Sequence, residues 1–77
     1  MARTVAELAP GERGVLASLD VPAHQARRLM EHGFLPGATV HAVRAAPGGD
    51  PCVFRVDGAD VALRLETARH LHLLESP

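Results

Sequence analysis

The sequence predicts a mainly β fold, in which about five short strands form a small barrel and one α-helix lies between the first and second strands. Two observations support this expectation. Apolar residues at helical spacing occur within residues 20–32, whereas from Thr39 onward they alternate with other residues at the period of two that strands show. Glycine and proline divide the alternating runs into short pieces, as a small barrel requires.

The chain is expected to form a single domain over residues 1–77, because a chain of this length has no room for a second core. Hydrophobic residues make up 47% of it, yet Phe34 and Phe54 are its two aromatic residues. We therefore expect a core built from valine, leucine and alanine, which suits a compact barrel of short strands.

The first expected elements are a helical turn and a strand. Thr4 and Glu7 have the S/T-x-x-E spacing of a capping box, which predicts a helical turn that ends at the proline and glycine of positions 10 and 11. Residues 14–19 then predict the first strand, and Leu16 is among its residues available for burial.

The helix is expected to follow Asp20 and to run to about His32. Asp20 is the expected N-cap, and Pro22 stands in the first turn, where its fixed φ suits a helix. Leu29 and Met30 belong to the apolar stripe that must pack against a core.

Two glycines shape the chain after the helix. Gly33 can take the positive φ that ends a helix, and Phe34 is expected to fold back onto Leu29 in a Schellman-type cap. Pro36 and Gly37 predict a reversing turn, since proline presets φ at the first central position and glycine accepts positive φ at the second.

Four further strands are predicted after this turn. They run from Thr39 to a glycine-rich loop at residues 47–51, and then over residues 52–56, 61–65 and 70–73. Asp57 and Gly58 predict a tight hairpin between the second and third of these runs, and residues 66–69 predict one helical turn before the last. An early helix favours an SH3-like barrel over an OB-fold, whose helix normally lies between the third and fourth strands.

Composition excludes several classes of function. The formal net charge of −1 argues against a general binder of nucleic acid or acidic membranes, which would carry a cationic excess. A single cysteine, Cys52, excludes an internal disulfide. The N-terminus lacks the apolar core of a secretory signal and no apolar run is long enough for a transmembrane helix, so we expect a cytoplasmic protein.

Nearly end to end, the chain resembles the FeoA family, the small cytosolic component of the bacterial ferrous-iron uptake system. The residues that carry the resemblance are Leu8, Pro10, Gly11, Gly14, Arg28, Leu29, Gly33, Pro36, Gly37, Val40, Ala46, Pro47, Gly49, Asp50, Pro51, Gly58, Ala62, Leu63, Arg64 and Ala68. Two positions depart from it, because similar proteins usually carry leucine where this chain has His32 and an aliphatic residue where it has Phe34.

The resemblance implies a non-enzymatic regulatory partner of FeoB, a membrane transporter whose cytosolic part carries a guanine-nucleotide-binding domain. Such a protein would reach the inner face of the membrane only through that partner. A related SH3-like domain ends the iron-dependent repressors of the DtxR type, which leaves open a role as a stand-alone relative acting on a transcription factor. Pairing of two copies through an exposed barrel edge also stays open.

Seven residues are the candidate partner contacts. They are Arg28, Phe34, Gly49, Asp50, Pro51, Arg55 and Arg64. The three arginines are expected on the helix and on the outer face of neighbouring strands, where they could meet an acidic surface of a partner or form a solvated face. Phe34 at the helix end either contributes to specificity or fills the core with a larger ring.

A metal site is the alternative hypothesis. His70 and His72 are two residues apart on one strand and so point to the same face, as two ligands of Fe(II) or another divalent transition metal would. A third ligand is not evident, although His24, His41, Glu66 and Glu75 are candidates. No cofactor is required by the resemblance, and exposed histidines on a small domain are more often solvated than bound to a metal.

Catalysis has little support in the sequence. No nucleophile is followed by a plausible base and orienting group, and Cys52 occupies an inward strand position typical of a buried structural thiol. The glycine-rich residues 47–50 are followed by neither a lysine nor a helix, so they predict a hairpin loop and not a phosphate-binding loop.

Overall fold

The computed structural model describes residues 3–74, which form a mainly β fold. In chain order, its elements are the 3₁₀ turn η1 (Val5–Glu7), β1 (Arg13–Leu19), α1 (Ala23–Glu31), β2 (Thr39–Ala45), β3 (Cys52–Val56), β4 (Ala59–Leu63), α2 (Leu65–Ala68) and β5 (Leu71–Leu73). The prediction of five strands with a helix between the first and second is confirmed.

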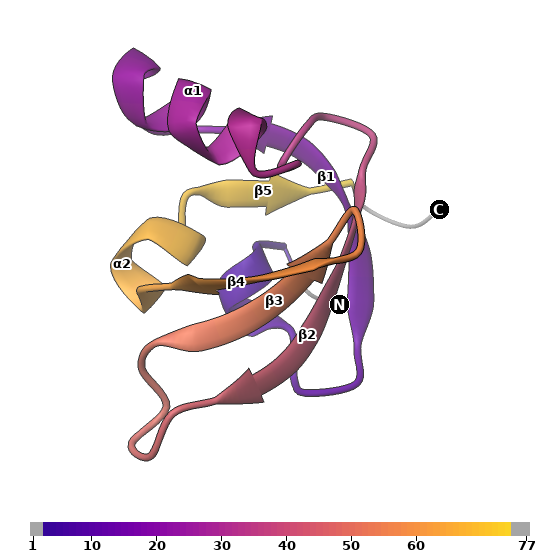
Figure 1. The fold of residues 1–77 in the computed structure, drawn as a ribbon, viewed down its shortest axis with the longest axis vertical. Helices are drawn as coiled ribbons and strands as arrows, with labels where there is room; N and C mark the ends of the chain where they lie inside the picture. Colours follow the sequence, from indigo (N-terminus) through magenta and orange to yellow (C-terminus); the bar gives the residue numbers. More distant parts are fainter. Residues whose placement is uncertain (1–2, 75–77) are drawn as a thin grey trace.

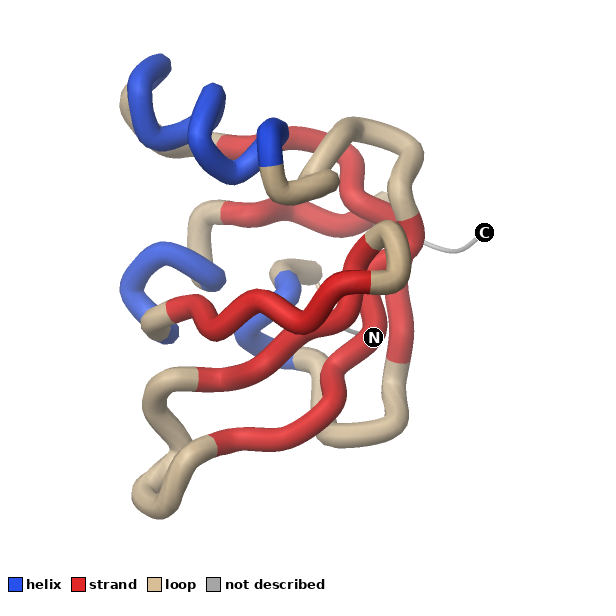
Figure 2. Tube along the Cα trace, in the orientation of Figure 1, coloured by secondary structure: helices blue, strands red, loops and turns tan. Residues whose placement is uncertain are grey.

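The five strands form one antiparallel sheet in the order β4-β3-β2-β1-β5. Residues 13–15 of β1 pair with β2, whereas residues 16–19 pair with β5, and the register of the β1–β5 pair shifts between Leu16 and Ser18. Such a bulge bends a strand, so β1 contributes to both sides of a curved sheet. The strands curve around a common interior, with α1 at one end of the molecule (Figures 1 and 2).

The N-terminal segment completes the far side of the sheet. Thr4 forms an isolated bridge with His72, and the Leu73 N–H donates to the Arg3 carbonyl over 2.8 Å. The expected capping box between Thr4 and Glu7 is present, and in it the Thr4 N–H donates to the Glu7 carboxylate at 3.3 Å. The outer edge of β5 is therefore covered by the beginning of the chain.

The core is aliphatic apart from two phenylalanines. Its buried residues are Val5, Leu16, Leu29, Phe34, Val40, Ala42, Phe54, Val56, Leu63, Ala68, Leu71 and Leu73. Two alternate residues of each of β2, β3 and β5 belong to this set, which confirms the alternation predicted for these strands. They are Val40 and Ala42, Phe54 and Val56, and Leu71 and Leu73.

The start of α1 differs from the prediction. Pro22 and not Asp20 is the N-cap, and the helix begins at Ala23. Asp20 instead contacts the segment of β5. Its N–H donates to the His70 carbonyl at 2.8 Å, and its Oδ2 lies 3.9 Å from Nε2 of His72. This pairing continues the β1–β5 ladder and keeps Asp20 outside the helix.

The end of α1 is the expected Schellman cap. Gly33 has a φ of +104°, its N–H donates to the Met30 carbonyl, and the Phe34 N–H donates to the Leu29 carbonyl at 3.1 Å. Phe34 is completely buried in the core, so the prediction that it contacts a partner is corrected and its alternative role as a core residue holds. Met30 is 38% exposed and lies outside the buried stripe that was expected to include it.

The third predicted strand after the helix, residues 61–65, is displaced toward the hairpin turn. Asp57 and Gly58 both have positive φ, as in a type I′ turn, and β4 starts directly after them at Ala59. The chain leaves the sheet after Leu63, and Leu65 already belongs to α2. Among residues 3–74, neither helix has the length and apolar character to span a membrane.

Candidate functional site

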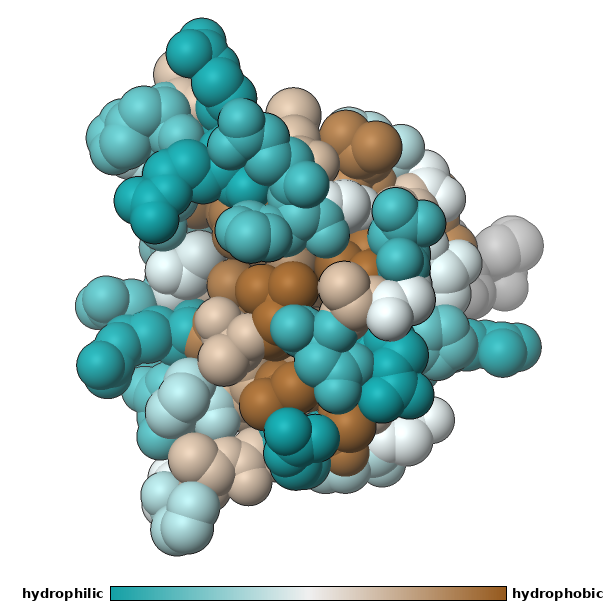
Figure 3. Space-filling model, viewed as in Figure 1, coloured by the Kyte–Doolittle hydropathy of each residue, from teal (hydrophilic) through white to brown (hydrophobic). Residues whose placement is uncertain are grey.

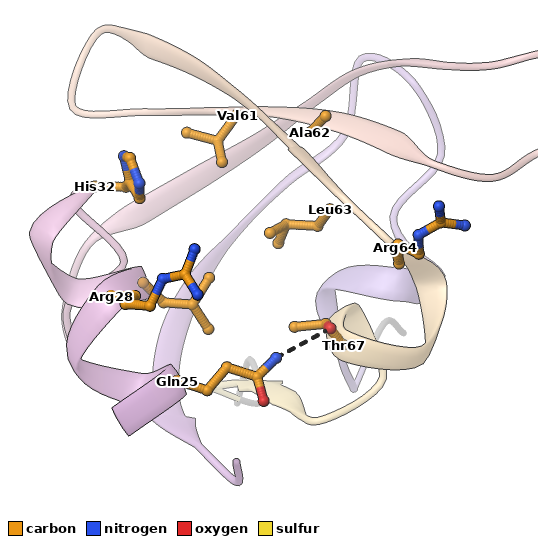
Figure 4. A pocket seen from close by; sticks show the side chains of 9 residues that line it. Gln25, Arg28, His32, Val61, Ala62, Leu63, Arg64 and Thr67 are labelled. Carbon is orange, nitrogen blue, oxygen red and sulfur yellow. Dashed lines mark hydrogen bonds between the residues drawn. The ribbon is translucent and has the colours of Figure 1, made fainter. Parts of the chain in front are cut away.

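A groove of about 310 Å³ lies between α1 and the edge strand β4 (Figure 4). Residues of α1, β4 and α2 contribute to it, together with the residues that directly follow α1 and β4. Its lining consists of Gln25, Arg28, Leu29, His32, Val61, Ala62, Leu63, Arg64 and Thr67. The helical residues follow the spacing i, i+3, i+4 and i+7, which places them on one face of the helix.

The floor of the groove is apolar. Leu29 and Leu63 each retain 7% exposure at the edge of the core, and Val61 is half-buried beside them. The space-filling view shows brown, apolar surface in the middle of this face, bordered by hydrophilic residues above and below (Figure 3). The groove therefore opens directly onto the hydrophobic core.

The rim of the groove is cationic. Arg28 points from α1 toward Leu63, His32 lies one turn further along the helix, and Arg64 stands at the opposite side (Figure 4). No aspartate or glutamate is among the lining residues, although the formal net charge of the chain is −1. The Gln25 amide donates to the Thr67 hydroxyl at 3.3 Å and joins α1 to α2 at this site.

Arg55, the third predicted arginine contact, lies on a different surface. Its Nε donates to Oδ1 of Asp60 at 2.7 Å and its guanidinium also reaches Oδ2 at 3.3 Å, across the β3–β4 pair. The hydrogen bond from Arg55 lowers the pKa of Asp60, with the charges of Arg55 and Arg44 acting in the same direction. The same hydrogen bond raises the pKa of Arg55. Arg55 thus already faces a carboxylate of its own chain.

The predicted loop residues Gly49, Asp50 and Pro51 lie at the end of the molecule opposite α1 (Figure 1). Asp50 Oδ1 accepts a hydrogen bond from the Leu65 N–H at 3.1 Å and thereby caps the N-terminus of α2. The Cys52 thiol donates to the Gly49 carbonyl at 3.3 Å, and Cys52 is only partly buried, whereas a buried structural thiol was predicted. The loop has structural contacts of its own and is separate from the groove.

In the described part of the chain, the histidines of the metal hypothesis are not joined by a third ligand. Within residues 3–74, no three His, Cys, Asp or Glu side chains come close enough to hold a metal ion. His70 lines a second hollow together with Asp20 and Glu66, but these side chains do not converge. Glu75, another candidate ligand, lies outside the described residues.

Sequence reasoning missed most of the groove. Arg28 and Arg64 were among the predicted contacts, but nothing indicated that they share one site. The helical face on which Arg28 and His32 lie could have been found from its spacing. The Gln25–Thr67 hydrogen bond joins residues 42 positions apart, so no local pattern indicates it.

An antiparallel barrel of short strands with a small groove beside its helix defines a class of protein, the small SH3-like domains. Comparison with known proteins narrows this class. The sequence profile of the FeoA domain matches residues 3–73, and the chain belongs to the FeoA family.

One curated relative is a fusion of two proteins in a single chain. The Fe(2+) transport protein A/Fe(2+) transporter FeoB fusion protein of Porphyromonas gingivalis is 30% identical over 69 residues, which are 90% of the present chain. The chain spans only 8% of the length of that fusion protein. The match therefore concerns the FeoA part.

Solved structures agree with the fold. FeoA of Chlorobium tepidum is 31% identical, with a TM-score of 0.84 over 94% of this chain and 70% of that one. FeoA of Stenotrophomonas maltophilia, described as a prokaryotic SH3 domain protein and complexed with zinc, is 36% identical, with a TM-score of 0.80 over 94% and 89%. A manganese-dependent transcriptional repressor shares the fold at 16% identity and a TM-score of 0.80, over 96% of this chain and 41% of its own.

Proposed function

We propose that this protein is a non-enzymatic accessory protein of ferrous iron uptake, which docks on the cytosolic part of a FeoB-type transporter. There it modulates the assembly or the nucleotide-dependent activity of the transporter. The observation that carries the proposal is the fusion of an FeoA part to FeoB in the Porphyromonas gingivalis relative. Fusion keeps two modules at high effective concentration, which favours partners that act together.

The size of the domain limits how it can act. A chain of 77 residues offers at most one patch of standard size, roughly 800 Å² per partner, and transient regulatory contacts are often smaller. We therefore expect modest affinity and rapid exchange, which suit a regulator. In this proposal the protein works in the cytoplasm and reaches the membrane only through the transporter.

The test is binding to detergent-solubilised FeoB from the same genome under anaerobic conditions. Binding is measured with GTP, with GDP and without nucleotide, each in the presence and absence of Fe(II). We expect saturable binding that depends on the nucleotide and is independent of Fe(II). Absence of binding in every state would contradict the proposal.

The other outcomes separate the alternatives. Binding only in the presence of Fe(II) would support a metal-sensing domain that uses His70 and His72. Co-purification with a transcription factor in place of the transporter would support a stand-alone relative of the repressor domain.

A further inference from the structure

We propose that the groove between α1 and β4 binds an extended segment of the partner that carries carboxylates beside aliphatic side chains, and that this segment pairs with β4 as an additional strand. The proposal rests on the proposed function for the identity of the partner. It combines three features of the groove: a free sheet edge, a cationic rim and an apolar floor.

The first feature is the edge. Among the strands of residues 3–74, β4 ends the strand order and pairs only with β3, through a two-residue turn that places Val56 opposite Ala59. In such a hairpin the backbone groups of Val61 point toward β3, whereas those of Asp60 and Ala62 point away from it. Among the described residues, no backbone group of another element hydrogen-bonds to the N–H or the carbonyl of Ala62, so both groups are free to pair with an added strand.

The other edge of the sheet shows the contrast. The outer side of β5 is covered by the N-terminal segment, through the Thr4–His72 bridge and the hydrogen bond from Leu73 to Arg3. Proteins usually protect exposed edges, because an unpaired strand recruits other strands. An edge that is left open beside a groove is the arrangement that recognition by strand addition uses.

The second feature is charge. Arg28, His32 and Arg64 are the ionisable residues of the lining, and within residues 3–74 no carboxylate lines the groove beside them. Asp60, the nearest acidic residue along β4, is held by Arg55 through the bidentate contact. Electrostatic complementarity therefore selects an acidic segment and rejects a basic one.

The third feature is the apolar floor. Leu29, Val61 and Leu63 line a volume of about 310 Å³, which is near the lower limit of ligand-binding cavities. Alternate side chains of an added strand point to the same face. One or two aliphatic side chains of the segment would enter the groove while its carboxylates reach the arginines at the rim.

The first experiment compares charge reversals. Arg28→Glu and Arg64→Glu are each expected to weaken binding of the solubilised transporter about tenfold or more. Arg13→Glu is the matched control, because Arg13 is an exposed arginine of β1 outside the groove lining, and its affinity should stay within twofold of the wild type. Unchanged far-UV circular dichroism and unfolding midpoints establish that the variants are folded.

The second experiment needs no transporter. Short capped peptides of alternating glutamate and valine, or of alternating lysine and valine, are titrated into the ¹⁵N-labelled protein. We expect shifts at residues 61–64 and His32 with the glutamate peptide only. Hydrogen exchange of the Ala62 amide with solvent should slow at least tenfold in the complex with the glutamate peptide. The amide of exposed Ala9, which lies outside the groove lining, serves as the control.

The outcomes separate the two proposals. If the wild type binds the transporter and both groove variants bind equally well, the groove inference is overturned and the proposed function stands. If the glutamate peptide binds the groove but the transporter does not bind the protein, the proposed function is contradicted and the inference that the groove binds an acidic segment stands. Equal binding of both peptides, or unchanged exchange at Ala62, would refute strand addition by an acidic segment.

Discussion

The arginines of this protein divide according to what faces them. Arg55 makes a bidentate contact with Asp60, and NH1 of Arg44 lies 4.0 Å from Oδ2 of the same carboxylate. Arg28 and Arg64 instead line a groove to which the described part of the chain contributes no carboxylate. The sequence predicted Arg28, Arg55 and Arg64 as surface cations, but only the structure shows that a carboxylate of the chain itself already pairs with Arg55.

The contact between Arg55 and Asp60 predicts a measurable titration. In the wild type, NMR titration of the Asp60 carboxyl should give a pKa below its ordinary value, and Arg55→Gln should raise it because the charged hydrogen bond is lost. A folded-state pKa below the unfolded value means that the pair stabilises the fold at neutral pH. This contribution is lost as the pH falls through the folded-state pKa. An identical Asp60 titration in both proteins would contradict the prediction.

Among the elements, α1 depends on close contact at its C-terminal end. A Cβ at Gly33 would lie 3.1 Å from the Cβ of Asp57, in the turn between β3 and β4. Gly33 also has a φ of +104°, which side chains resist. The glycine therefore both ends the helix and lets the helix end approach the hairpin.

Alanine substitution should separate these two roles. Gly37 has a φ of +94° but open space around its missing Cβ, so Gly37→Ala should lower the free energy of unfolding by about 1 kcal/mol from backbone strain alone. Gly33→Ala adds the clash with Asp57, and we expect a loss of roughly 2–3 kcal/mol. Urea denaturation measures both values. Equal losses would show that the approach of the helix to the hairpin costs nothing.

Element boundaries were predicted where turn chemistry is local. Gly33, Pro36 with Gly37, and Asp57 with Gly58 all lie in turns as expected, because their dihedral preferences act within a few residues. The predicted start of α1 was wrong, because the N–H of Asp20 donates to the carbonyl of His70, fifty residues later in the chain. Competition from a distant strand cannot be read from a capping pattern.

The whole molecule is closed by its N-terminal segment. Val5 is completely buried although it is near the beginning of the chain, and the segment that carries it pairs with β5 near the end. Removing this contact should therefore weaken the entire fold, because the two ends of the chain share one core.

Val5→Ala tests this cooperativity. We expect the free energy of unfolding to fall by roughly 2 kcal/mol, with one transition and an unchanged denaturant slope. Leu74→Ala is the control, since it also truncates an aliphatic side chain near an end of the described chain but at a position that is 57% exposed. Its effect should stay within about 0.5 kcal/mol. Separate transitions at the N-terminal segment and in the sheet would refute a single cooperative unit.

The sequence by itself determined the class of fold, the succession of elements and the family. Strand periodicity, turn residues and the positions shared with FeoA are local signals, which is why the period of two that buries Val40 with Ala42, and Phe54 with Val56, matches the structure. The tertiary structure alone decided that Phe34 is buried, that Asp50 caps α2, and that Arg28 and Arg64 border one groove. Each of these depends on how the barrel closes, because closure brings together residues that no local pattern connects.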